Sequence, residues 1–434
     1  MYTPGNPDRP NLPRWISVFI KDTDCGALAP RRPALFIQPD ARLFEAPTSF
    51  LRSEYVESGK RASPSTWAAA AYALASWFDF LWEIGIRDWR AAARDDLIMY
   101  RDSYATAVSP KTGRPYAPVT ISNRMSVILE FHGYAGERGL YEGDILAEVR
   151  AEQVADGVPI DKDALAHIRK GPRTKRMTSG LIPRRRQART SIRPFLVNEL
   201  RALLEIVGPR ATERGGGDQR PSRDRLTCDL GWACGLRLDE IHQLNTLQFL
   251  SLHPDEHAPV AEQSISVVGK GRKKRNIAIP NWLVLDALAY ISDERRHALA
   301  AGGITGRQDR HALFVAGLDG NFPGRPITHR RMQQRLEEAC LQAGLIEEVA
   351  RTNPETGVIR VERKSKHCIH DLRHTYAVLT YWAEKKSGNA EPWKKIQAQL
   401  GHKNLSTTTD TYLSFVEIFG ERQRLVDVRM MIGL

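Results

Sequence analysis

Three short segments of this 434-residue chain carry side chains whose types and spacing suit chemistry on a phosphodiester. They are Gly235-Leu236-Arg237-Leu238-Asp239-Glu240, His370-Asp371-Leu372-Arg373-His374 and Leu400-Gly401-His402, the last followed by Tyr412. Guanidinium groups bind phosphate oxygens through paired N–H donors, and a phenol can attack phosphorus. Two arginines, the histidines at 370 and 402 and one tyrosine therefore predict DNA strand cleavage through a covalent phosphotyrosine, with no metal required.

The spacing within these segments indicates which side chains share a helix face. Glu240 follows Arg237 by three residues, so its carboxylate can hold the guanidinium, although alone this pattern would be an ordinary surface ion pair. His370, Arg373 and His374 fall on one face in the same way. Zinc between the two histidines is an alternative, but no third ligand of metal type lies nearby, so no metal site is predicted.

A tyrosine alone usually packs or makes a hydrogen bond, and only its neighbours single out Tyr412. The Ser-Thr-rich turn before it, 406–408, suits the start of a helix. Tyr376 and Tyr381 are rival phenols near the second arginine segment. Both fall in a helix that must bury an apolar face, and we interpret them as packing residues.

The composition fits a partner that is a polyanion. The net charge is +12, and 42% of residues are hydrophobic, enough for the cores of two or three domains. Nucleic acid is the first expectation and an anionic membrane surface the second. No run of about 18 apolar residues exists, and the N-terminus does not resemble a signal peptide. Five cysteines without a Cys-x-x-Cys pair support neither zinc nor a disulfide framework, and a reducing cytoplasm is expected.

The N-terminal third predicts an extension and then a small helical domain. Residues 1–45 show no sustained period and are interpreted as an extension of unknown role. Residues 46–150 repeat apolar positions at steps of three and four, which mark one face of a helix. These stripes are Trp67, Ala71, Leu74, Phe78 and Leu81, then Ile121, Met125, Ile128, His132 and Ala135. A further helix is expected near 97–104.

A basic segment separates this domain from the rest, and 151–192 is interpreted as a linker. Within it, 161–190 holds ten Lys and Arg residues against two Asp residues, a net charge of +8. Gly171-Pro172, Gly180 and Pro183 would interrupt a helix there. The segment is either a solvated linker or a basic strap lying across a DNA backbone. The concentration of charge favours the strap.

Residues 193–434 return to helical patterns, expected over 195–207, from about 224 to 233 and over 328–345. Gly235 would end the second of these helices and deliver Arg237 at the start of the next turn. Alternating apolar residues at 265–267 and 277–279 predict a hairpin. Its tip, Gly269-Lys270-Gly271-Arg272-Lys273-Lys274-Arg275, is strongly basic.

Taken together, these segments resemble the tyrosine recombinase family, also called phage-type integrases. The matching pieces are Ala233–Glu240, Gly269–Gly271, His370–Ala377 and Leu400–His402, with Thr407, Thr408 and Tyr412. The resemblance covers 193–415 strongly, and 46–150 more weakly as the family's core-binding domain. It implies a mainly α fold with a small β-sheet (α+β). A helical N-terminal core-binding domain and a catalytic domain, 193–434, would form a clamp on DNA.

The resemblance implies a site-specific DNA recombinase of the integrase or transposon type, independent of metal, ATP and cofactor. Tyr412 would be the nucleophile, giving a 3′-phosphotyrosyl intermediate and a free 5′-hydroxyl. Arg237 and Arg373 would hold the non-bridging oxygens. Lys270, placed between two glycines, would protonate the departing 5′-oxygen. The alternatives for that acid are Lys273 and Lys274.

Supporting roles follow from the same resemblance. His370 would assist the phenol, His402 would contact a phosphate oxygen, and Glu240 would orient Arg237. Further basic residues are predicted to contact DNA. They are Arg173, Lys175, Arg176, Arg184, Arg185, Arg186, Arg272, Lys273, Lys274, Arg275 and His374.

The implied partner is double-stranded DNA with a specific recombination site. On synapsed DNA the protein would be a homotetramer, and free it would be a monomer or weak oligomer. An accessory DNA-bending or directionality protein is a further partner of such reactions. The expected compartment is a bacterial cytoplasm, in association with the nucleoid and not with a membrane. The apolar tail after Tyr412 would fold back on its own domain or pass to a neighbouring protomer, and we favour the second.

Two other functions use the same residues. A nicking-closing enzyme of the type IB topoisomerase or telomere-resolvase kind would share the chemistry, but the helical domain and basic linker favour a recombinase. A DNA-binding relative that has lost activity is the other alternative. The intact set of Arg237, Lys270, His370, Arg373, His402 and Tyr412 argues against that alternative.

Overall fold

The computed structural model of the chain describes residues 15–19, 33–38, 40–58, 64–110, 112–146, 150–154, 174–178, 182, 192–269, 273–353, 356–402, 404–409, 411–412 and 416. Two compact units emerge. The first comprises Met1–Gln187 with Ala350–Val361, and the second Ala188–Val349 with Glu362–Leu434. Helices dominate and the strands form small sheets, so the predicted fold class, mainly α with a small β component, is confirmed. No helix among the described residues is long and apolar enough to cross a membrane.

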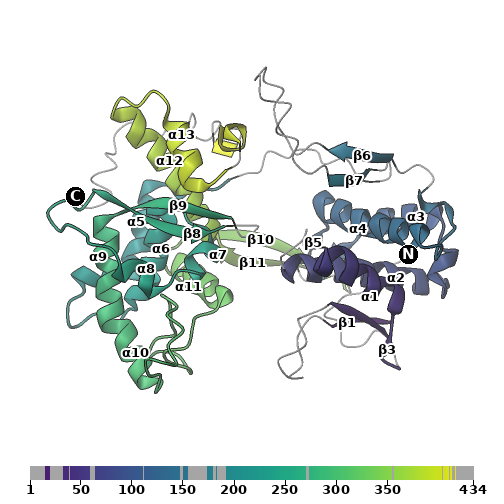
Figure 1. The fold of residues 1–434 in the computed structure, drawn as a ribbon, viewed down its shortest axis with the longest axis horizontal. Coiled ribbons are helices and arrows are strands. Elements are labelled where there is room, and N and C mark those ends of the chain that lie inside the picture. Colours follow the sequence, from purple (N-terminus) through teal and green to yellow (C-terminus); the bar gives the residue numbers. More distant parts are fainter. Residues whose placement is uncertain are drawn as a thin grey trace. The chain divides into compact units, whose positions relative to one another are not determined.

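The first unit is a helical bundle with a small antiparallel sheet (Figure 1). Its principal helices, α1 to α4, are Glu45–Phe50, Pro64–Glu83, Arg94–Thr106 and Pro118–Glu137, with a π-helix over Leu51–Glu57. Its strands, β1 to β7, are Ile16–Phe19, Ala34–Ile37, Arg42–Leu43, Val108–Ser109, Arg114–Pro115, Arg150–Val154 and Thr174–Thr178. The helices expected near 64–84, 97–104 and 120–135 are therefore present.

Aromatic residues fill the core of this unit, as the apolar stripes predict. Trp77, Phe78 and Phe131 are fully buried, and each contributes about 1.5–3 kcal/mol through the apolar area removed from water. His132, also on a predicted stripe, is buried among these rings and accepts a hydrogen bond from the indole of Trp77 at 3.1 Å. Burial lowers the pKa of His132 to about 3, so it packs as a neutral ring.

The N-terminal segment contributes structure that the sequence did not predict. Strands β1, β2 and β3 form a sheet in that order, with Ile16 opposite Ile37. Asp79 on α2 accepts the backbone N–H of Ile16 at 3.0 Å, and Leu35 is fully buried. Part of the expected extension thus packs onto the helical bundle. Residues 1–14 and 20–32 lie outside the described part of the chain.

The second unit is also mainly helical, and it contains the three segments that carry the candidate catalytic residues. Its helices, α5 to α13, are Val197–Val207, Ser222–Cys234, Leu238–His242, Thr246–Leu250, Asn281–Tyr290, Arg296–Ala301, His329–Gln342, Ile369–Lys386 and Pro392–Leu400. Its strands, β8 to β11, are Glu262–Val268, Lys274–Pro280, Ile346–Thr352 and Ile359–Ser365, of which β10 and β11 run into residues grouped with the first unit. The predicted helices over 195–207, 224–233 and 328–345 are present, each within a few residues of its expected bounds.

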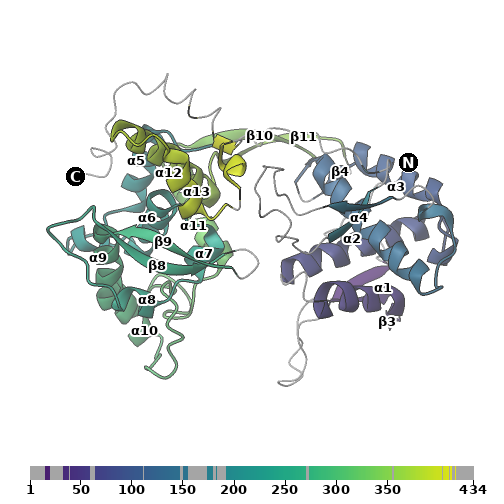
Figure 2. The same ribbon diagram turned by 45° about the horizontal axis from the view of Figure 1, so that its top comes forward.

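The β8–β9 hairpin has the register that its alternating pattern predicts, with Ile265 opposite Ile277 and both side chains buried. Figure 2 shows it beside α6 and α13. Gln399, near the end of α13, fixes this arrangement because its amide bonds both backbone groups of Ala278 on β9, at 2.8 and 2.9 Å, and the Cys234 carbonyl that ends α6, at 3.1 Å. Three segments far apart in sequence are therefore held at one point.

Candidate active site

Arg237 is delivered by the end of helix α6, as its sequence predicts. Gly235 ends that helix in the left-handed conformation, with φ of 66°, and a Cβ there would lie 2.6 Å from a ring carbon of Tyr376. A glycine is therefore needed for both the turn and the packing. Arg237 then caps α7, where its backbone N–H donates to Glu240 at 2.9 Å. The Arg237 side chain remains 30% exposed, the most accessible cation of the cluster around Glu240.

The Glu240 carboxylate is the centre of this cluster. It is 2% exposed and accepts Nη1 of Arg237 at 2.9 Å, the pairing that the spacing of three predicts. Arg275 on β9 adds a bidentate contact, at 2.6 and 2.9 Å, and a guanidinium nitrogen of Arg373 lies 3.9 Å away. Burial alone would raise the pKa of Glu240. The hydrogen bonds from Arg275 and the Arg237 backbone lower it to about 2.

Arg275, which the sequence predicts as a contact for DNA, is directed into the protein in this structure. Its donors are directed to Glu240 and to the Gln399 carbonyl, at 3.2 Å, and its side chain is only 16% exposed. The basic run placed Arg275 beside Lys273 and Lys274 as a contact for DNA. However, side chains alternate along β9, so Arg275 turns toward Glu240 while Lys274 is exposed, and Lys273, just before the strand, is exposed as well. Arg275 supports the site by holding the Glu240 carboxylate in place.

Arg373 on α12 connects the ends of two other helices. It is 1% exposed and donates to the carbonyls of Gly235, at 2.6 Å, and Leu400, at 2.7 Å. These bonds satisfy C-terminal carbonyls of α6 and α13, which a helix leaves without partners. Burial and the nearby Arg237 lower the pKa of Arg373 to about 9, so it stays protonated at neutral pH.

His402 lies beside Arg373 because α13 ends at Gly401. That glycine is left-handed, with φ of 67°, and a Cβ on it would lie 2.7 Å from the Arg275 side chain. Nε2 of His402 accepts a hydrogen bond from the Arg373 guanidinium at 3.3 Å. Nδ1 of the same ring lies 2.8 Å from the Thr408 hydroxyl. Burial and the surrounding arginines lower the pKa of His402 to about 4. The partners favour a neutral ring that accepts at Nε2 and donates from Nδ1.

Tyr412 faces this cluster from the last described helical segment. It is 1% exposed, and burial raises the pKa of its phenol to about 12, against the charges of Arg373 and Arg237, which lower it. Its hydroxyl lies 3.1 Å from Nδ1 of His374. The rival phenol of Tyr376 is buried in the hydrophobic cluster, and Tyr381 packs against the Trp393 ring at 4.5 Å, in agreement with their predicted packing roles.

His374, and not His370, contacts the Tyr412 hydroxyl in the structure. His370 was expected at the phenol and His374 at DNA. The structure places His374 against Tyr412, and the ring centroid of the exposed His370, one turn earlier on the helix, lies 4.7 Å from that of His374. The two histidines are one helical turn apart on one face, so their spacing alone could not distinguish them. Burial and Arg373 lower the pKa of His370.

Several predicted residues lie outside the described part of the chain. The proposed acid Lys270 and the DNA-contact candidate Arg272 fall in the gap at the hairpin tip. The linker candidates Arg173, Arg184, Arg185 and Arg186 also fall outside it, as do the side chains of Lys175 and Arg176, which belong to β7. The tail after Tyr412 is described only at Val416, which is buried.

No role in the site was predicted for two supporting residues, although Thr408 belongs to the matching segments. Thr408 is fully buried and orients His402, and Gln399 joins three elements. Each left a weak signal. Thr408 lies in the turn before Tyr412, and Gln399 is a polar residue on the apolar stripe of α13, between Ile396 and Leu400.

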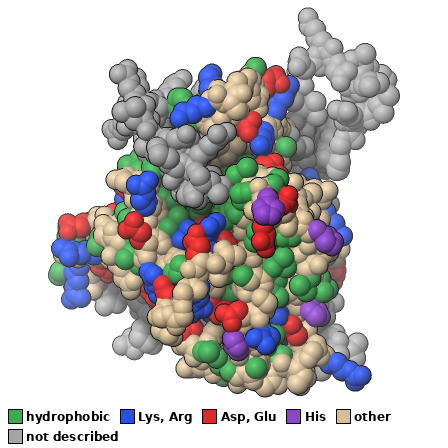
Figure 3. All heavy atoms as spheres, turned by 90° about the vertical axis from the view of Figure 1, so that its left-hand side faces the viewer, with side chains coloured by type: hydrophobic (Ala, Val, Ile, Leu, Met, Phe, Trp, Pro, Cys, Tyr) green, Lys and Arg blue, Asp and Glu red, His purple; other side chains and the backbone are tan. Residues whose placement is uncertain are grey.

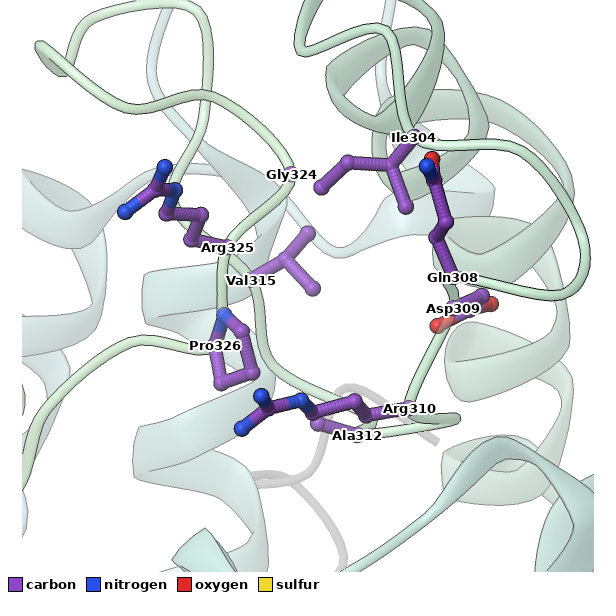
Figure 4. Close-up of a pocket in the computed structure, with 9 residues that line it drawn as sticks. All are labelled: Ile304, Gln308, Asp309, Arg310, Ala312, Val315, Gly324, Arg325 and Pro326. Atoms are coloured by element: carbon purple, nitrogen blue, oxygen red, sulfur yellow. The ribbon is translucent and has the colours of Figure 1, made fainter. Parts of the chain in front are cut away.

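A cavity of about 550 Å³ lies apart from these residues, in the loops that follow α10 (Figure 4). Arg310, Arg325 and Asp309 contribute to its lining, and Asp309 already pairs with Arg295 at 2.7 Å. None of the nine lining residues belongs to the cluster around Glu240. The candidate site is therefore built around buried arginines and is distinct from this cavity.

Comparison with known proteins places the same segments in one family. Residues 196–415 match the Phage integrase family. Tyrosine recombinase XerC of Histophilus somni (strain 2336) is 30% identical over 202 residues, covering 44% of this chain and 50% of that protein. XerC of Haemophilus influenzae (strain PittEE) is 31% identical over the same length and shares of each chain. The chain thus spans about half the length of these curated relatives.

Among solved structures, the fold is similar to that of the XerH site-specific recombinase bound to palindromic difH substrate, in a post-cleavage complex. The TM-score is 0.50 at 16% identity, over 86% of this chain and 84% of that chain. At this identity the likeness concerns the fold alone.

Replacing Glu240 by Gln tests the centre of the cluster. The substitution keeps the size of the side chain but removes the charge that the arginines surround. Because Arg275 and Arg373 would then be buried without that counter-charge, we expect the free energy of unfolding at pH 7 to fall by about 3–5 kcal/mol. Urea unfolding of the full chain measures this change.

The matched control is Glu338→Gln, which removes an exposed carboxylate paired with Arg331 and Arg335 at 3.2 Å, for a change below about 1 kcal/mol. Acid titration gives a second readout. Because folding lowers the Glu240 pKa from 4.5 to about 2, its stabilisation is complete above pH 4.5 and is lost as pH falls toward 2. The Glu240→Gln variant should lack this loss. Equal stability of the two variants would refute a central role for Glu240.

Replacing Gly401 by Ala tests the contact between Gly401 and Arg275. Both Gly401 and Gly388 have positive φ, 67° and 86°, but only Gly401 has a neighbour where the Cβ would go. We expect Gly388→Ala to destabilise the protein by about 1 kcal/mol through backbone strain, and Gly401→Ala by about 1–3 kcal/mol more through overpacking. Thermal unfolding of both variants measures the difference, and equal losses would exclude the steric contribution.

Proposed function

Because the chain belongs to the Phage integrase family, we propose that it is a site-specific DNA recombinase that cuts and rejoins strands through a 3′-phosphotyrosyl intermediate. One observation carries this proposal. Arg237 and Arg373 lie at the buried Glu240 carboxylate, and His402 contacts Arg373, so groups from distant segments are held together. The charges of both arginines act on the Tyr412 phenol. A phosphate held by these arginines would lie within reach of a nucleophile.

The chemistry follows from these groups. The Tyr412 oxygen forms a bond to phosphorus while the bond to the 5′-oxygen breaks, so the phosphodiester energy is kept in the covalent adduct. Negative charge on the non-bridging oxygens is stabilised by Arg237 and Arg373, whose orientation Glu240 and the helix-end carbonyls fix in advance. We assign Lys270 as the acid for the 5′-oxygen and His402 as a contact of a phosphate oxygen, which it can make as a donor once its ring hydrogen moves from Nδ1 to Nε2.

Access to the site requires a movement near Tyr412. Both Tyr412 and Arg373 are 1% exposed, so neither can contact a phosphate while the last helical segment stays in this position. We propose that DNA binding displaces this segment enough to open Arg373 while the phenol remains near it. The preceding segment at 404–409 is held to the core partly by the bond between His402 and Thr408.

We propose that DNA also binds outside the active site. Residues 46–150 would form a core-binding domain, 151–192 a basic strap and 193–434 the catalytic domain, together acting as a clamp. One face of the second unit bears Lys and Arg interspersed with Asp and Glu (Figure 3). A surface of mixed sign lacks the continuous positive field that a DNA backbone favours. The strap, with its net charge of +8 over 161–190, and the exposed Lys273 and Lys274 are the preferred contacts.

The proposed assembly is a homotetramer on two synapsed recombination sites in a bacterial cytoplasm, with the tail after Tyr412 passed to a neighbouring protomer. Such a tail would couple the position of the nucleophile to assembly, because Tyr412 lies just before it in the chain. An accessory DNA-bending or directionality protein would act on the DNA.

Replacing Tyr412 by Phe tests the nucleophile. The variant should bind DNA like the wild type, because only a buried hydroxyl is lost, but should form no covalent adduct. The measurement is gel separation of protein–DNA adducts on nicked duplexes tiled across the genomic DNA that flanks this reading frame. Tyr381→Phe is the matched control and should form the adduct. An adduct with the Tyr412 variant would overturn the assignment, and none with the wild type would favour an inactive DNA-binding protein.

Replacing Lys270 by Ala tests the acid. Loss of a general acid slows cleavage by about 10²–10⁴-fold. A 5′-bridging phosphorothiolate needs no proton on its leaving sulfur and should restore the rate. Single-turnover cleavage of matched oxygen and sulfur substrates measures the rescue. Failure of rescue for Lys270→Ala, with rescue for Lys273→Ala or Lys274→Ala, would move the acid to one of those lysines.

A further inference from the structure

His374 is the side chain that the structure places on the nucleophile. Its Nδ1 lies 3.1 Å from the Tyr412 hydroxyl, and the two ring centroids are 5.5 Å apart. Both groups are largely enclosed, since Tyr412 is 1% exposed and His374 half-buried. A neutral imidazole in this position accepts the phenol hydrogen at Nδ1 and carries its own hydrogen on Nε2.

Burial, together with the charges around it, keeps the His374 ring neutral. On its own helix it faces His370, Asp371 and Arg373, and His402 faces it from the end of α13. Burial and the His370 ring lower the pKa of His374 to about 4, with Asp371 acting in the opposite direction. At neutral pH the His374 ring is therefore neutral and can accept a proton. The Tyr412 phenol beside it, whose pKa is about 12, carries its proton.

We propose that His374 is a catalytic general base that takes the Tyr412 proton as the phenol attacks phosphorus. This inference rests on the proposed function, because it needs Tyr412 to be the nucleophile. The contact itself carries it, since a base must lie within hydrogen-bond reach of the proton it removes. His370, which the sequence favoured for this task, has its ring beyond His374.

The proton and electron count is complete. In cleavage, the phenol O–H bond breaks, its proton moves to Nδ1 of His374, and the phenol oxygen forms the bond to phosphorus. The phosphorus–oxygen bond to the 5′-carbon side breaks, and that oxygen leaves as a hydroxyl after protonation by the separate acid. In rejoining, the 5′-hydroxyl returns its proton to the separate acid as its oxygen attacks phosphorus, the bond between phosphorus and the Tyr412 oxygen breaks, and the His374 imidazolium returns its proton to that oxygen. The base is thereby regenerated within one cycle.

The same contact has a second interpretation with the opposite consequence. If His374 only held Tyr412 in a closed position, its removal would release the nucleophile and speed cleavage. If His374 is the base, its removal slows cleavage, because the phenol then attacks phosphorus with no group to take its proton. The direction of the rate change therefore decides between the two roles.

The test replaces His374 by Asn, whose amide oxygen can accept a hydrogen bond where Nδ1 lies but cannot take up a proton. Single-turnover cleavage is measured on the nicked flanking duplex that traps the wild type. At pH 7 we expect a rate about 10²-fold lower than wild type. From about pH 6 to 8 the cleavage rate of the variant should rise about tenfold per pH unit, because hydroxide must replace the base. The wild-type rate should not change over this range. Added imidazole should rescue His374→Ala.

Controls separate this role from others. His257→Asn makes the same change at an exposed histidine outside the site and should leave the rate unchanged. The 5′-bridging phosphorothiolate should not rescue His374→Asn, because the defect lies at the nucleophile. In DNA-free protein, the ¹⁵N resonance of His374 Nδ1 should shift when Tyr412 is replaced by Phe, while that of His257 does not.

Each outcome decides the inference. A slowed, pH-dependent His374→Asn with imidazole rescue of the Ala variant supports it. A wild-type rate and profile, or faster cleavage, overturns it and leaves the proposed function intact because wild-type cleavage is then observed. If the wild type forms no adduct although the ¹⁵N shift shows the contact, the proposed function has failed and the inference falls with it.

Discussion

The buried carboxylate of Glu240 is the interaction on which the second unit's chemistry depends. Arg237, Arg275 and Arg373 come from three separate parts of the chain, and their mutual repulsion would prevent them from sharing one interior site without an anion among them. Glu240 pairs with Arg275, which is mostly buried, and this ion pair stabilises the fold. Glu240 also pairs with Arg237, which is partly exposed, and so holds a cation where it faces solvent. A phosphate would add a second anion to this cluster.

The C-terminal ends of α6 and α13 also hold the arginines in place. Arg373 donates to the carbonyls that close α6 and α13, and Gln399 joins both regions to β9. The glycines at 235 and 401 allow these ends to approach, since either Cβ would contact a neighbouring side chain. Guanidinium groups fixed in this way need little rearrangement when charge develops on a phosphate, which is the physical basis of electrostatic catalysis. The part of the site that must move is the segment bearing Tyr412.

The sequence predicted the helices and the β8–β9 hairpin because their apolar residues recur at the proper period, and it selected Arg237, Arg373, His402 and Tyr412 through linked motifs. It did not predict Arg275 beneath Glu240, because a basic run does not reveal which side of a strand faces inward. The roles of His370 and His374 also needed coordinates, since residues four apart share a helix face. Strands β1 to β3 and β10–β11 lacked a clear alternating pattern, and their pairing depends on tertiary contacts.

The most direct test of the central claim is the chemical identity of the covalent adduct. Wild-type protein trapped on a nicked duplex would be digested with protease and nuclease, and the remaining peptide–nucleotide would be sequenced by mass spectrometry. The account predicts a nucleotide joined through its 3′-phosphate to the Tyr412 oxygen. A nucleotide on another residue, or one joined through a 5′-phosphate, would contradict it.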